Sequence, residues 1–275
     1  MTFFAPASIT CFFSTVIGDN PLLSGSLGVG ITLNIGVRAK VSKKKGIWVN
    51  GEQWDFPTVR YVIERLNCDS GVEIIMDVPA GCGFGMSGAS ALSAAFELNR
   101  AFNLGKSFLQ LADIAHEAEV INKTGLGDVV CQSYGGVVVR KTAASPSKAS
   151  IDRFLWDEEL DLLILGSIST ESILGDTRIR ERINKIGRSC LSEFLKKPTL
   201  ENLFDQSKRF SVETGLIDDE LMDIVEAVES VGGKASMVML GKAVFAYNGF
   251  DALKEFGKPF KAAIDLCGVR FYDFK

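Results

Sequence analysis

The stretch that decides the fold is "DVPAGCGFGMSGASALSAAFELN", residues 77–99. Four glycines fall within eight residues, Gly81, Gly83, Gly85 and Gly88, and an alanine-rich helical pattern follows at once. Glycine is costly to order, and its use is to let the backbone approach another group closely. A glycine loop that opens a helix directs free N–H groups and the positive end of the helix dipole at one place. The pattern therefore predicts a phosphate-binding loop.

Two common phosphate loops do not fit this stretch. Residues 83–88 satisfy G-x-G-x-x-G, but the dinucleotide fold also needs a second strand that ends in Asp or Glu about 20 residues on. Here a helix is followed by another helix, with no strand expected before residue 136. A Walker A loop needs Lys after its last glycine, and no lysine occurs between residues 46 and 105. Tight packing of a strand against a helix, without a ligand, would explain one or two of the glycines but not all four.

Length and composition indicate a globular chain. It has 275 residues, 47% of them apolar, which allows one large domain or two modest ones. A net charge of −4 gives no electrostatic footprint for nucleic acid. No secretory signal is expected at the start, and no apolar run reaches the ~18–20 residues that span a bilayer. Six scattered cysteines and a single histidine indicate reduced thiols and exclude two-histidine metal motifs. We therefore expect a cytoplasmic protein without nucleic-acid or membrane partners.

Hydrophobic periodicity predicts an α+β fold, because strands and helices mix without strict βαβ alternation. The polar stretch "KTAASPSKAS", residues 141–150, is the expected boundary between a domain of residues 1–150 and one of residues 151–275. The expected strands are 9–16, 28–41, 46–49, 71–78, 135–140, 160–168, 235–240, 243–247 and a final pair near 262–272. The expected helices start near Pro57 and cover 87–102, 108–121, 176–196, 199–214, 218–231 and 250–257.

The glycine stretch also fits the pattern P-x3-G-[LF]-G-x-S, and in this it resembles the nucleotide loop of the GHMP kinases. The family pattern has two serines and then two alanines, and this chain has Met86 at the first serine and Gly88 at the first alanine. The family counterpart of Ser87 faces the β- and γ-phosphates of ATP and the metal ion. The resemblance implies ATP binding by Pro79, Gly81, Gly83, Phe84, Gly85, Met86, Ser87, Gly88 and Ala89.

A second segment, "HEAEVINKTGLGDVVCQSYGG" (116–136), is similar to the matching part of the superfamily. Counting back from its final Gly-Gly places Asp128 at the catalytic aspartate and Glu119, or alternatively Glu117, at the magnesium glutamate. The resemblance thus implies that Asp128, Glu119 and Ser87 are catalytic, and that Ser87 and Glu119 hold Mg²⁺. Without the family resemblance, the position of Asp128 after Gly127 indicates a helix N-cap. Glu119 would then be a solvent-exposed residue of its helix.

Further segments narrow the resemblance to the archaeal pantoate kinases within the GHMP superfamily. They are "GGVVVR" (135–140), "KASMVMLGKAVFA" (234–246) and "SGSLGVGI" (24–31). The family fold has a ribosomal-S5-like N-terminal half and a ferredoxin-like C-terminal half. The implied reaction transfers the γ-phosphate of ATP to the 4-hydroxyl of pantoate, on the route to coenzyme A, in a homodimer.

The resemblance also implies a group of substrate-binding residues. Arg140 would clamp the carboxylate of pantoate with its guanidinium fork, although a strand-end surface charge is the simpler reading. His116, three residues before Glu119, would donate to the anionic substrate, although a lone helical histidine is more often a packing residue. The implied set is Ser24 or Ser26, His116 and Arg140.

One departure from the family bears on the substrate. Ala7 and Ser8 stand where the family is expected to have Gly-His. Pantothenate, which has an amide where pantoate has its carboxylate, therefore stays open as the acceptor. A non-catalytic nucleotide sensor on the same fold is the alternative from another functional class.

Overall fold

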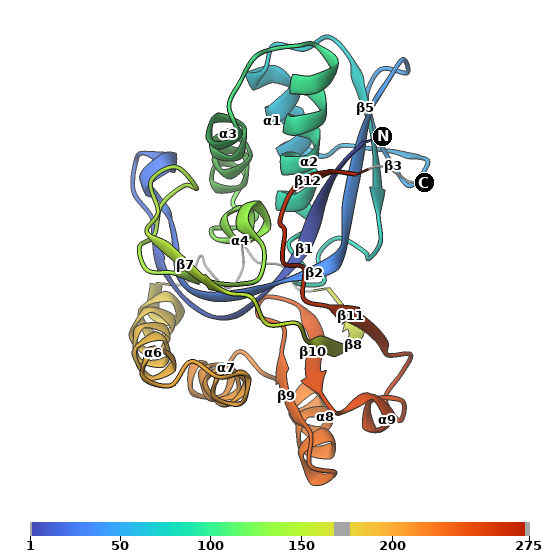
Figure 1. Cartoon of the computed structure of the whole chain (residues 1–275). Coiled ribbons are helices and arrows are strands. Elements are labelled where there is room, and N and C mark those ends of the chain that lie inside the picture. The colour runs from blue at the N-terminus through green and yellow to red at the C-terminus, as the bar shows by residue number, and fades with distance from the viewer. Residues whose placement is uncertain (1, 168–176, 273–275) are drawn as a thin grey trace.

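The computed structural model describes residues 2–167 and 177–272. It is an α+β structure with an eight-stranded and a four-stranded sheet. Figure 1 shows the long curved hairpin of the first two strands running between two groups of helices, with the two chain ends side by side. Residue 168 of the strand expected at 160–168, and residue 176 of the next expected helix, lie outside the described residues.

The larger sheet has the strand order β12-β1-β2-β5-β3-β4, with β6 paired to β2 and β7 paired to β6. Its two longest strands, β1 and β2, are antiparallel from Phe3–Ala39 to Val16–Gly25. The short strands β3 and β5 are parallel. The strands are β1 (Thr2–Val16), β2 (Gly25–Ser42), β3 (Ile47–Val49), β4 (Glu52–Trp54), β5 (Gly71–Met76), β6 (Val137–Arg140), β7 (Ile151–Phe154) and β12 (Arg270–Tyr272).

Strand β1 is the centre of the core. From Phe4 to Thr15 every residue except Thr10 is buried, without the alternation of a half-exposed strand. Burial of consecutive residues in this way is typical of a strand that is covered on both faces. Helices from both parts of the chain pack on it, and Gly187 lets one of them approach the carbonyl of Phe13. These helices are α2 (Met86–Ala101), α4 (Asp128–Tyr134), α6 (Thr177–Lys196) and α7 (Leu200–Thr214).

The helices of the first half pack around α2, which is almost entirely buried. Its neighbours are α1 (Pro57–Arg65) and α3 (Phe108–Ile121). The capping box expected from Ser107 and Gln110 is present at the start of α3 and confirms that helix boundary. A 3-10 turn, η1 (Pro21–Leu23), lies in the β1–β2 connection and packs on α3.

The smaller sheet has the order β11-β8-β10-β9 and is antiparallel throughout. Two helices, α7 and α8, pack against it on β9 and β10. The last helix covers only four residues, so the expected helix over 250–257 is too long. The elements are β8 (Glu159–Gly166), α8 (Asp219–Ser230), β9 (Lys234–Met237), β10 (Lys242–Tyr247), α9 (Phe250–Leu253) and β11 (Phe260–Ala263).

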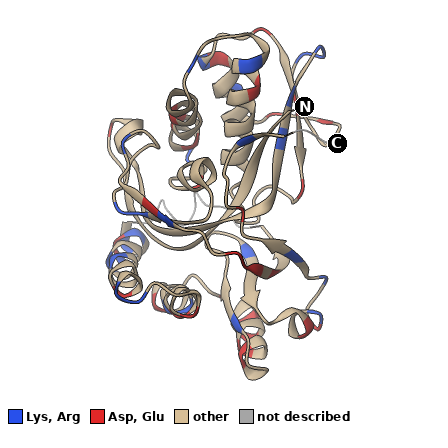
Figure 2. Ribbon diagram, in the orientation of Figure 1, with Lys and Arg blue, Asp and Glu red and all other residues tan. Residues whose placement is uncertain are grey.

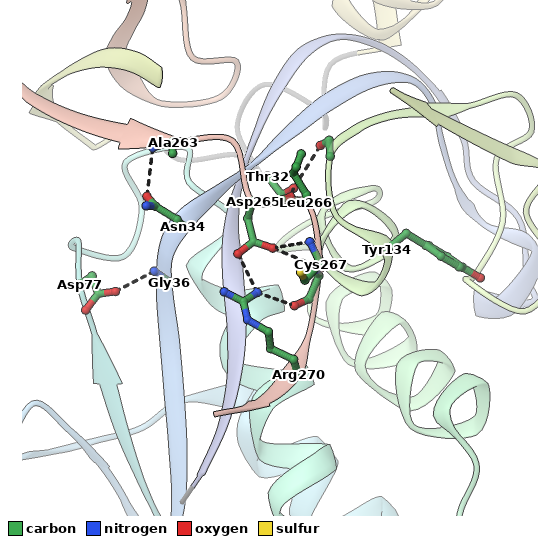
Figure 3. Close-up of polar contacts among 12 residues, drawn as sticks. Thr32, Asn34, Gly36, Asp77, Tyr134, Ala263, Asp265, Leu266, Cys267 and Arg270 are labelled. Atoms are coloured by element: carbon green, nitrogen blue, oxygen red, sulfur yellow. Dashed lines mark hydrogen bonds and ion pairs between the residues drawn. The ribbon is translucent and has the colours of Figure 1, made fainter. Parts of the chain in front are cut away.

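The segment after β11 returns to the larger sheet, as Figure 3 shows. Asp265 anchors this crossover, since its backbone exchanges hydrogen bonds with Thr32 of β2 and its carbonyl also accepts from Gly136. The buried Asp265 carboxylate accepts from the backbone N–H groups of Cys267 and Gly268 at 3.0 and 2.9 Å, and from Arg270 at 2.6 Å. The crossover therefore joins the smaller sheet to the larger one.

Several elements were not expected from the sequence. Helix α4 and strands β4 and β7 had no predicted counterpart, and β6 begins at Val137 because Gly135 and Gly136 have positive φ. Strands β7 and β12, which both follow residue 150, belong to the larger sheet. The division into domains 1–150 and 151–275 stays a prediction.

Both signs of charge are spread over the outer helices, and Lys and Arg gather on α6 (Figure 2). In the described ranges, none of the helices combines the length and apolar character needed to cross a membrane.

The Asp265 crossover leads to a stability prediction. Asp265→Ala leaves two backbone N–H groups and Arg270 without their acceptor, so we expect the free energy of unfolding to fall by about 3 kcal/mol. Asp251→Ala is the control, because it removes an exposed pair with Lys254 and should cost less than about 1 kcal/mol. Urea denaturation of both variants measures the two values, and equal losses would contradict the anchoring role of Asp265.

Candidate active site

The glycine loop between β5 and α2 makes several close approaches. Gly81, Gly83 and Gly85 all have positive φ, at 84°, 87° and 63°. A Cβ on Gly83 would lie 2.9 Å from the Cα of Gly241, in the turn between β9 and β10. A Cβ on Gly88 would lie 3.0 Å from Oε1 of Gln132 in α4. The glycines thus let the loop touch both α4 and the second half of the chain, besides opening the N-terminus of α2.

A cleft lies in front of this N-terminus. Its wall is formed by the glycine loop, the start of β2, the loop before α4 and the β9–β10 turn. Helix α2 has no side-chain cap, because its N-cap is Gly85. The helix start can therefore direct its first N–H groups toward an anion in the cleft. The cleft is lined by Thr10, Phe13, Ser26, Ala80, Gly81, Gly83, Gly85, Met86, Ser87, Thr124, Gly125, Leu126, Gly127, Asp128, Met239 and Leu240.

Asp128 is the carboxylate that lines the cleft directly. It is the first residue of α4, and the N-cap is Gly127, so the expected N-cap role of Asp128 is wrong. The reason is that its Oδ1 accepts a hydrogen bond from the Ser8 hydroxyl at 2.9 Å instead of bonding its own helix. Burial raises the pKa of Asp128, while the Ser8 hydrogen bond and the charge of Arg140 oppose that rise.

Glu119, rather than Glu117, lies beside the cleft. Its Oε1 accepts from the Thr124 hydroxyl at 2.7 Å, and its Oε2 lies next to Gly125. Glu117 lies toward α1, where it contacts Arg65 at 3.6 Å and Tyr61. Burial raises the pKa of Glu119 to about 7, although hydrogen bonds from Thr124 and Ser87 lower it.

The donor set around Glu119 fits a magnesium ion that is completed by phosphate oxygens. The Oε2 atom of Glu119 is buried and has no hydrogen-bond partner among the described residues. Within residues 2–167 and 177–272 no group of three or more His, Cys, Asp or Glu could hold a metal by itself. Mg²⁺ is commonly bound by one or two carboxylates together with waters and substrate phosphates, so Glu119, with the Ser87 hydroxyl, would be a sufficient set of protein ligands.

Arg140 ends strand β6 and is fully buried, so the reading as an exposed strand-end charge is wrong. Its Nε donates to the carbonyl of Ser26 at 3.2 Å and its Nη1 to Sγ of Cys131 at 2.6 Å. Its Nη2 has no partner in the described part of the chain. A Cβ on Gly127 would lie 2.8 Å from the guanidinium carbon, so the positive charge lies directly behind this wall of the cleft. A bidentate fork is not free, because two of the three nitrogens are occupied.

The other expected substrate residues lie at different depths. Ser26 lines the cleft. The Ser24 hydroxyl bonds instead to Gly18 and Asn20 within the β1–β2 connection. His116 is buried behind it, with Nε2 at 2.8 Å from the carbonyl of Ser24, and burial lowers its pKa. The structure thus brings Ser26 to the cleft and sets Ser24 and His116 behind it.

Some lining residues were missed by the sequence reading. Thr10 and Phe13 come from β1, and Met239 and Leu240 from the β9–β10 turn. Leu240 has a positive φ of 62°, which is unusual for a residue with a side chain. In the sequence, segment 234–246 indicates only a resemblance to the pantoate kinases. Its Gly241, which allows a close backbone approach to Gly83, is the feature that could have pointed to this part of the cleft. Four of the expected ATP residues are not among the residues that line the cleft: Pro79, which is exposed, and Phe84, Gly88 and Ala89, which are buried.

This chain is similar to known proteins in both sequence and fold. Residues 56–136 match the GHMP kinases N terminal domain. The chain is 36% identical to the pantoate kinase of Methanocaldococcus jannaschii over 92% of this chain and 94% of that protein. A solved structure described as a phosphotransferase related to the CoA biosynthesis pathway is 33% identical, with a TM-score of 0.86 and 98% of both chains covered.

A more distant structure shows the fold alone. The homoserine kinase of Cytophaga hutchinsonii is 15% identical, with a TM-score of 0.66 over 98% of this chain and 96% of that one. The predicted α+β GHMP kinase fold is therefore confirmed.

Burial of Glu119 leads to a prediction for the nucleotide-free protein in EDTA. Between about pH 4.5 and 7 the folded chain binds a proton at Glu119 that the unfolded chain has released. The free energy of unfolding should therefore fall as pH rises through this window. Glu119→Gln removes the effect, so its stability relative to wild type should increase by about 3 kcal/mol between pH 4.5 and 8. Denaturant titrations across this pH range measure the difference, and parallel pH profiles would contradict it.

Proposed function

This chain belongs to the GHMP kinases, in the family of the pantoate kinases, and we propose that it transfers the γ-phosphoryl group of ATP to the 4-hydroxyl of pantoate. The product would be 4-phosphopantoate, for coenzyme A biosynthesis. The observation that carries the proposal is that Asp128 and Ser87 line one cleft at the N-terminus of α2, with Glu119 beside them.

The phosphates of ATP are assigned to the glycine loop. Its three positive-φ glycines and the uncapped start of α2 offer backbone N–H groups and a positive dipole end to the same space. Ser87 and Glu119 would hold Mg²⁺, which supplies neutralisation of phosphate charge when bound. The partner-free Oε2 of Glu119 supports this assignment.

Asp128 is assigned to the attacking hydroxyl. The 4-hydroxyl oxygen of pantoate forms a bond to the γ-phosphorus, the bond from that phosphorus to the bridging oxygen of ADP breaks, and the hydroxyl proton passes to Asp128. A Cβ on Gly125 would lie 3.1 Å from Oδ2 of Asp128, so this oxygen faces a residue that lines the cleft. Catalysis of this kind depends mainly on placement and on charge neutralisation.

The carboxylate of pantoate is assigned to the wall formed by Ser26 and Gly127. Arg140 lies behind that wall, fully buried and without a carboxylate among its hydrogen-bond partners. The charge of Asp128 already acts on this guanidinium, and an anionic substrate would compensate the buried positive charge further. Nη2 is the nitrogen that can donate to it. Ser24 and His116 would act by holding the segment that carries Ser26.

The remaining parts of the proposal concern location and assembly. The six cysteines form no disulfide in the structure, which supports a reducing compartment, the cytoplasm. The homodimer rests on the resemblance to the family and is measurable by light scattering of the purified chain.

The direct test of the substrate is a coupled ADP-release assay with pantoate and pantothenate side by side. We expect pantoate to have the higher kcat/KM, because pantothenate replaces its carboxylate with an amide at the position that Arg140 faces. A wild-type preference for pantothenate would overturn the choice of substrate. ATP binding without turnover on either compound would indicate a nucleotide sensor.

Substitution of Arg140 tests the recognition of pantoate separately from the binding of ATP. Arg140→Met keeps most of the buried volume and removes the charge, so KM for pantoate should rise by about 30- to 150-fold, the scale of a hydrogen bond to a charged group. KM for ATP should stay within about 3-fold, because the phosphates are assigned to other residues. Arg140→Lys keeps the charge and should lose less. Steady-state kinetics with each substrate varied separately measures these values, and an unchanged pantoate KM in Arg140→Met would remove Arg140 from substrate recognition.

A further inference from the structure

A buried series of hydrogen bonds joins the glycine loop to Asp128. Nε2 of Gln132 in α4 donates to the carbonyl of Gly85 at 2.8 Å and to the hydroxyl oxygen of Ser8 at 3.1 Å. The Ser8 hydroxyl in turn donates to Oδ1 of Asp128 at 2.9 Å. We call the two side chains of Ser8 and Gln132 the Ser8–Gln132 clamp. No step of the proposed reaction uses either side chain.

The direction of these hydrogen bonds follows from the groups themselves. The carbonyl oxygen of Gly85 can only accept, so the amide nitrogen of Gln132 must face it. The same nitrogen then donates to the oxygen of Ser8. A hydroxyl has one proton, and an ionised carboxylate can only accept, so the proton of Ser8 points to Asp128. Gln132 therefore determines where the single proton of Ser8 goes.

The clamp is shielded from water and packed closely. Ser8 is 1% exposed and Gln132 is fully buried. A Cβ on Gly85 would lie 2.7 Å from both Nε2 of Gln132 and Oγ of Ser8, so only glycine fits between them. The backbone N–H of Ser8 also donates to the carbonyl of Phe84 at 3.0 Å. The Gln132 amide is held through its Nε2 atom, which makes both hydrogen bonds, while its Oε1 atom is buried and has no hydrogen-bond partner among the described residues.

We propose that Ser8 and Gln132 are positioning residues that fix the carboxylate of Asp128 relative to the phosphate loop. The clamp occupies Oδ1 and leaves Oδ2 facing Gly125 at the cleft. Because Gln132 also bonds Gly85, the N-cap of α2, the same amide sets the distance between the phosphate loop and the carboxylate. The inference rests on the proposed role of Asp128 as the group that receives the hydroxyl proton.

The expected consequence is a separation of kcat from KM. Neither side chain lines the cleft, so substrate binding should be nearly unchanged when one is removed. A reacting group displaced by about 1 Å can cost on the order of 100-fold in rate. Loss of the clamp should thus lower kcat and leave the substrate affinities in place.

The test uses three variants and a matched control. Ser8→Ala and Gln132→Met should each lower kcat by about 10- to 100-fold, with KM for ATP and for pantoate within about 3-fold of wild type. The kcat of the double variant should lie within about 3-fold of the kcat of the slower single variant, because both side chains act through one hydrogen bond to Asp128. Ser133→Ala is the control, since it removes a buried hydroxyl of α4 whose one hydrogen bond among the described residues goes to the Val129 carbonyl, and its kcat should stay near wild type.

Two further measurements separate the possible failures. The nucleotide dissociation constant and the thermal unfolding midpoint of each variant show whether a lower kcat reflects damage to the fold. If kcat falls in proportion to the thermal midpoint in all the variants, Ser133→Ala included, the clamp is overturned. Asp128→Asn, expected to lose at least about 100-fold in kcat, is the reference in the same assay. If Asp128→Asn is inactive and Ser8→Ala and Gln132→Met keep full kcat, the clamp is overturned and the proposed function stands. A wild type inert toward pantoate and pantothenate would overturn both claims.

Discussion

The missing side chain at Gly85 is the constraint on which the site depends. At this residue the glycine loop touches β1 through Ser8 and α4 through Asp128 and Gln132, and a Cβ would lie within 3.0 Å of all three. The left-handed backbone of Gly85 then starts α2 without a side-chain cap. One residue therefore sets both the close approach of the Asp128 carboxylate and the uncapped N-terminus of α2. The long core strand β1 supplies the rigid base for this contact, since it is buried under helices from both halves of the chain.

Two buried charges give the cleft its chemical character. Arg140 brings a positive charge behind the wall of Ser26 and Gly127, and Glu119 brings a carboxylate whose pKa burial raises to about 7. Each has one polar atom without a hydrogen-bond partner in the described chain, Nη2 and Oε2 respectively. Buried polar groups are usually paired, so unpaired ones are expected where a ligand completes the bonding. An anionic substrate and a phosphate-bound cation would satisfy these two atoms.

Local signals in the sequence were sufficient for the fold class and for most helices. The glycine loop, the Ser107–Gln110 capping box and the period of α2 and α3 each depend on residues close in sequence, and the structure has these elements where they were expected. Pairing of β12 with β1 joins residues 2–4 to 270–272, and nothing local indicates such a contact. Helix α4 covers only seven residues between glycines, which is too short for a periodic pattern.

The contrast between local signals and contacts of residues distant in sequence applies to the candidate site as well. Motifs indicated Asp128, Ser87 and either Ser24 or Ser26, and the structure brings Asp128, Ser87 and Ser26 to one cleft. The burial of Arg140 depends on contacts with β2 and α4, so the sequence could not separate a clamp from a surface charge. Ser8 was noted only as a departure from the family pattern, because its hydrogen bond to Asp128 spans 120 positions.

The regiochemistry of the product is the most direct test of the central claim, that Asp128 activates the primary hydroxyl of pantoate. Proton-coupled ³¹P NMR of a reaction with stoichiometric enzyme, ATP and pantoate would show it. We expect a new phosphomonoester triplet, because the phosphorus on the 4-oxygen couples to the two protons of a CH₂ group, and with Asp128→Asn the same triplet should grow at least about 100-fold more slowly. A doublet from phosphate on the secondary hydroxyl, or inorganic phosphate as the only new signal besides those of ADP, would contradict the claim.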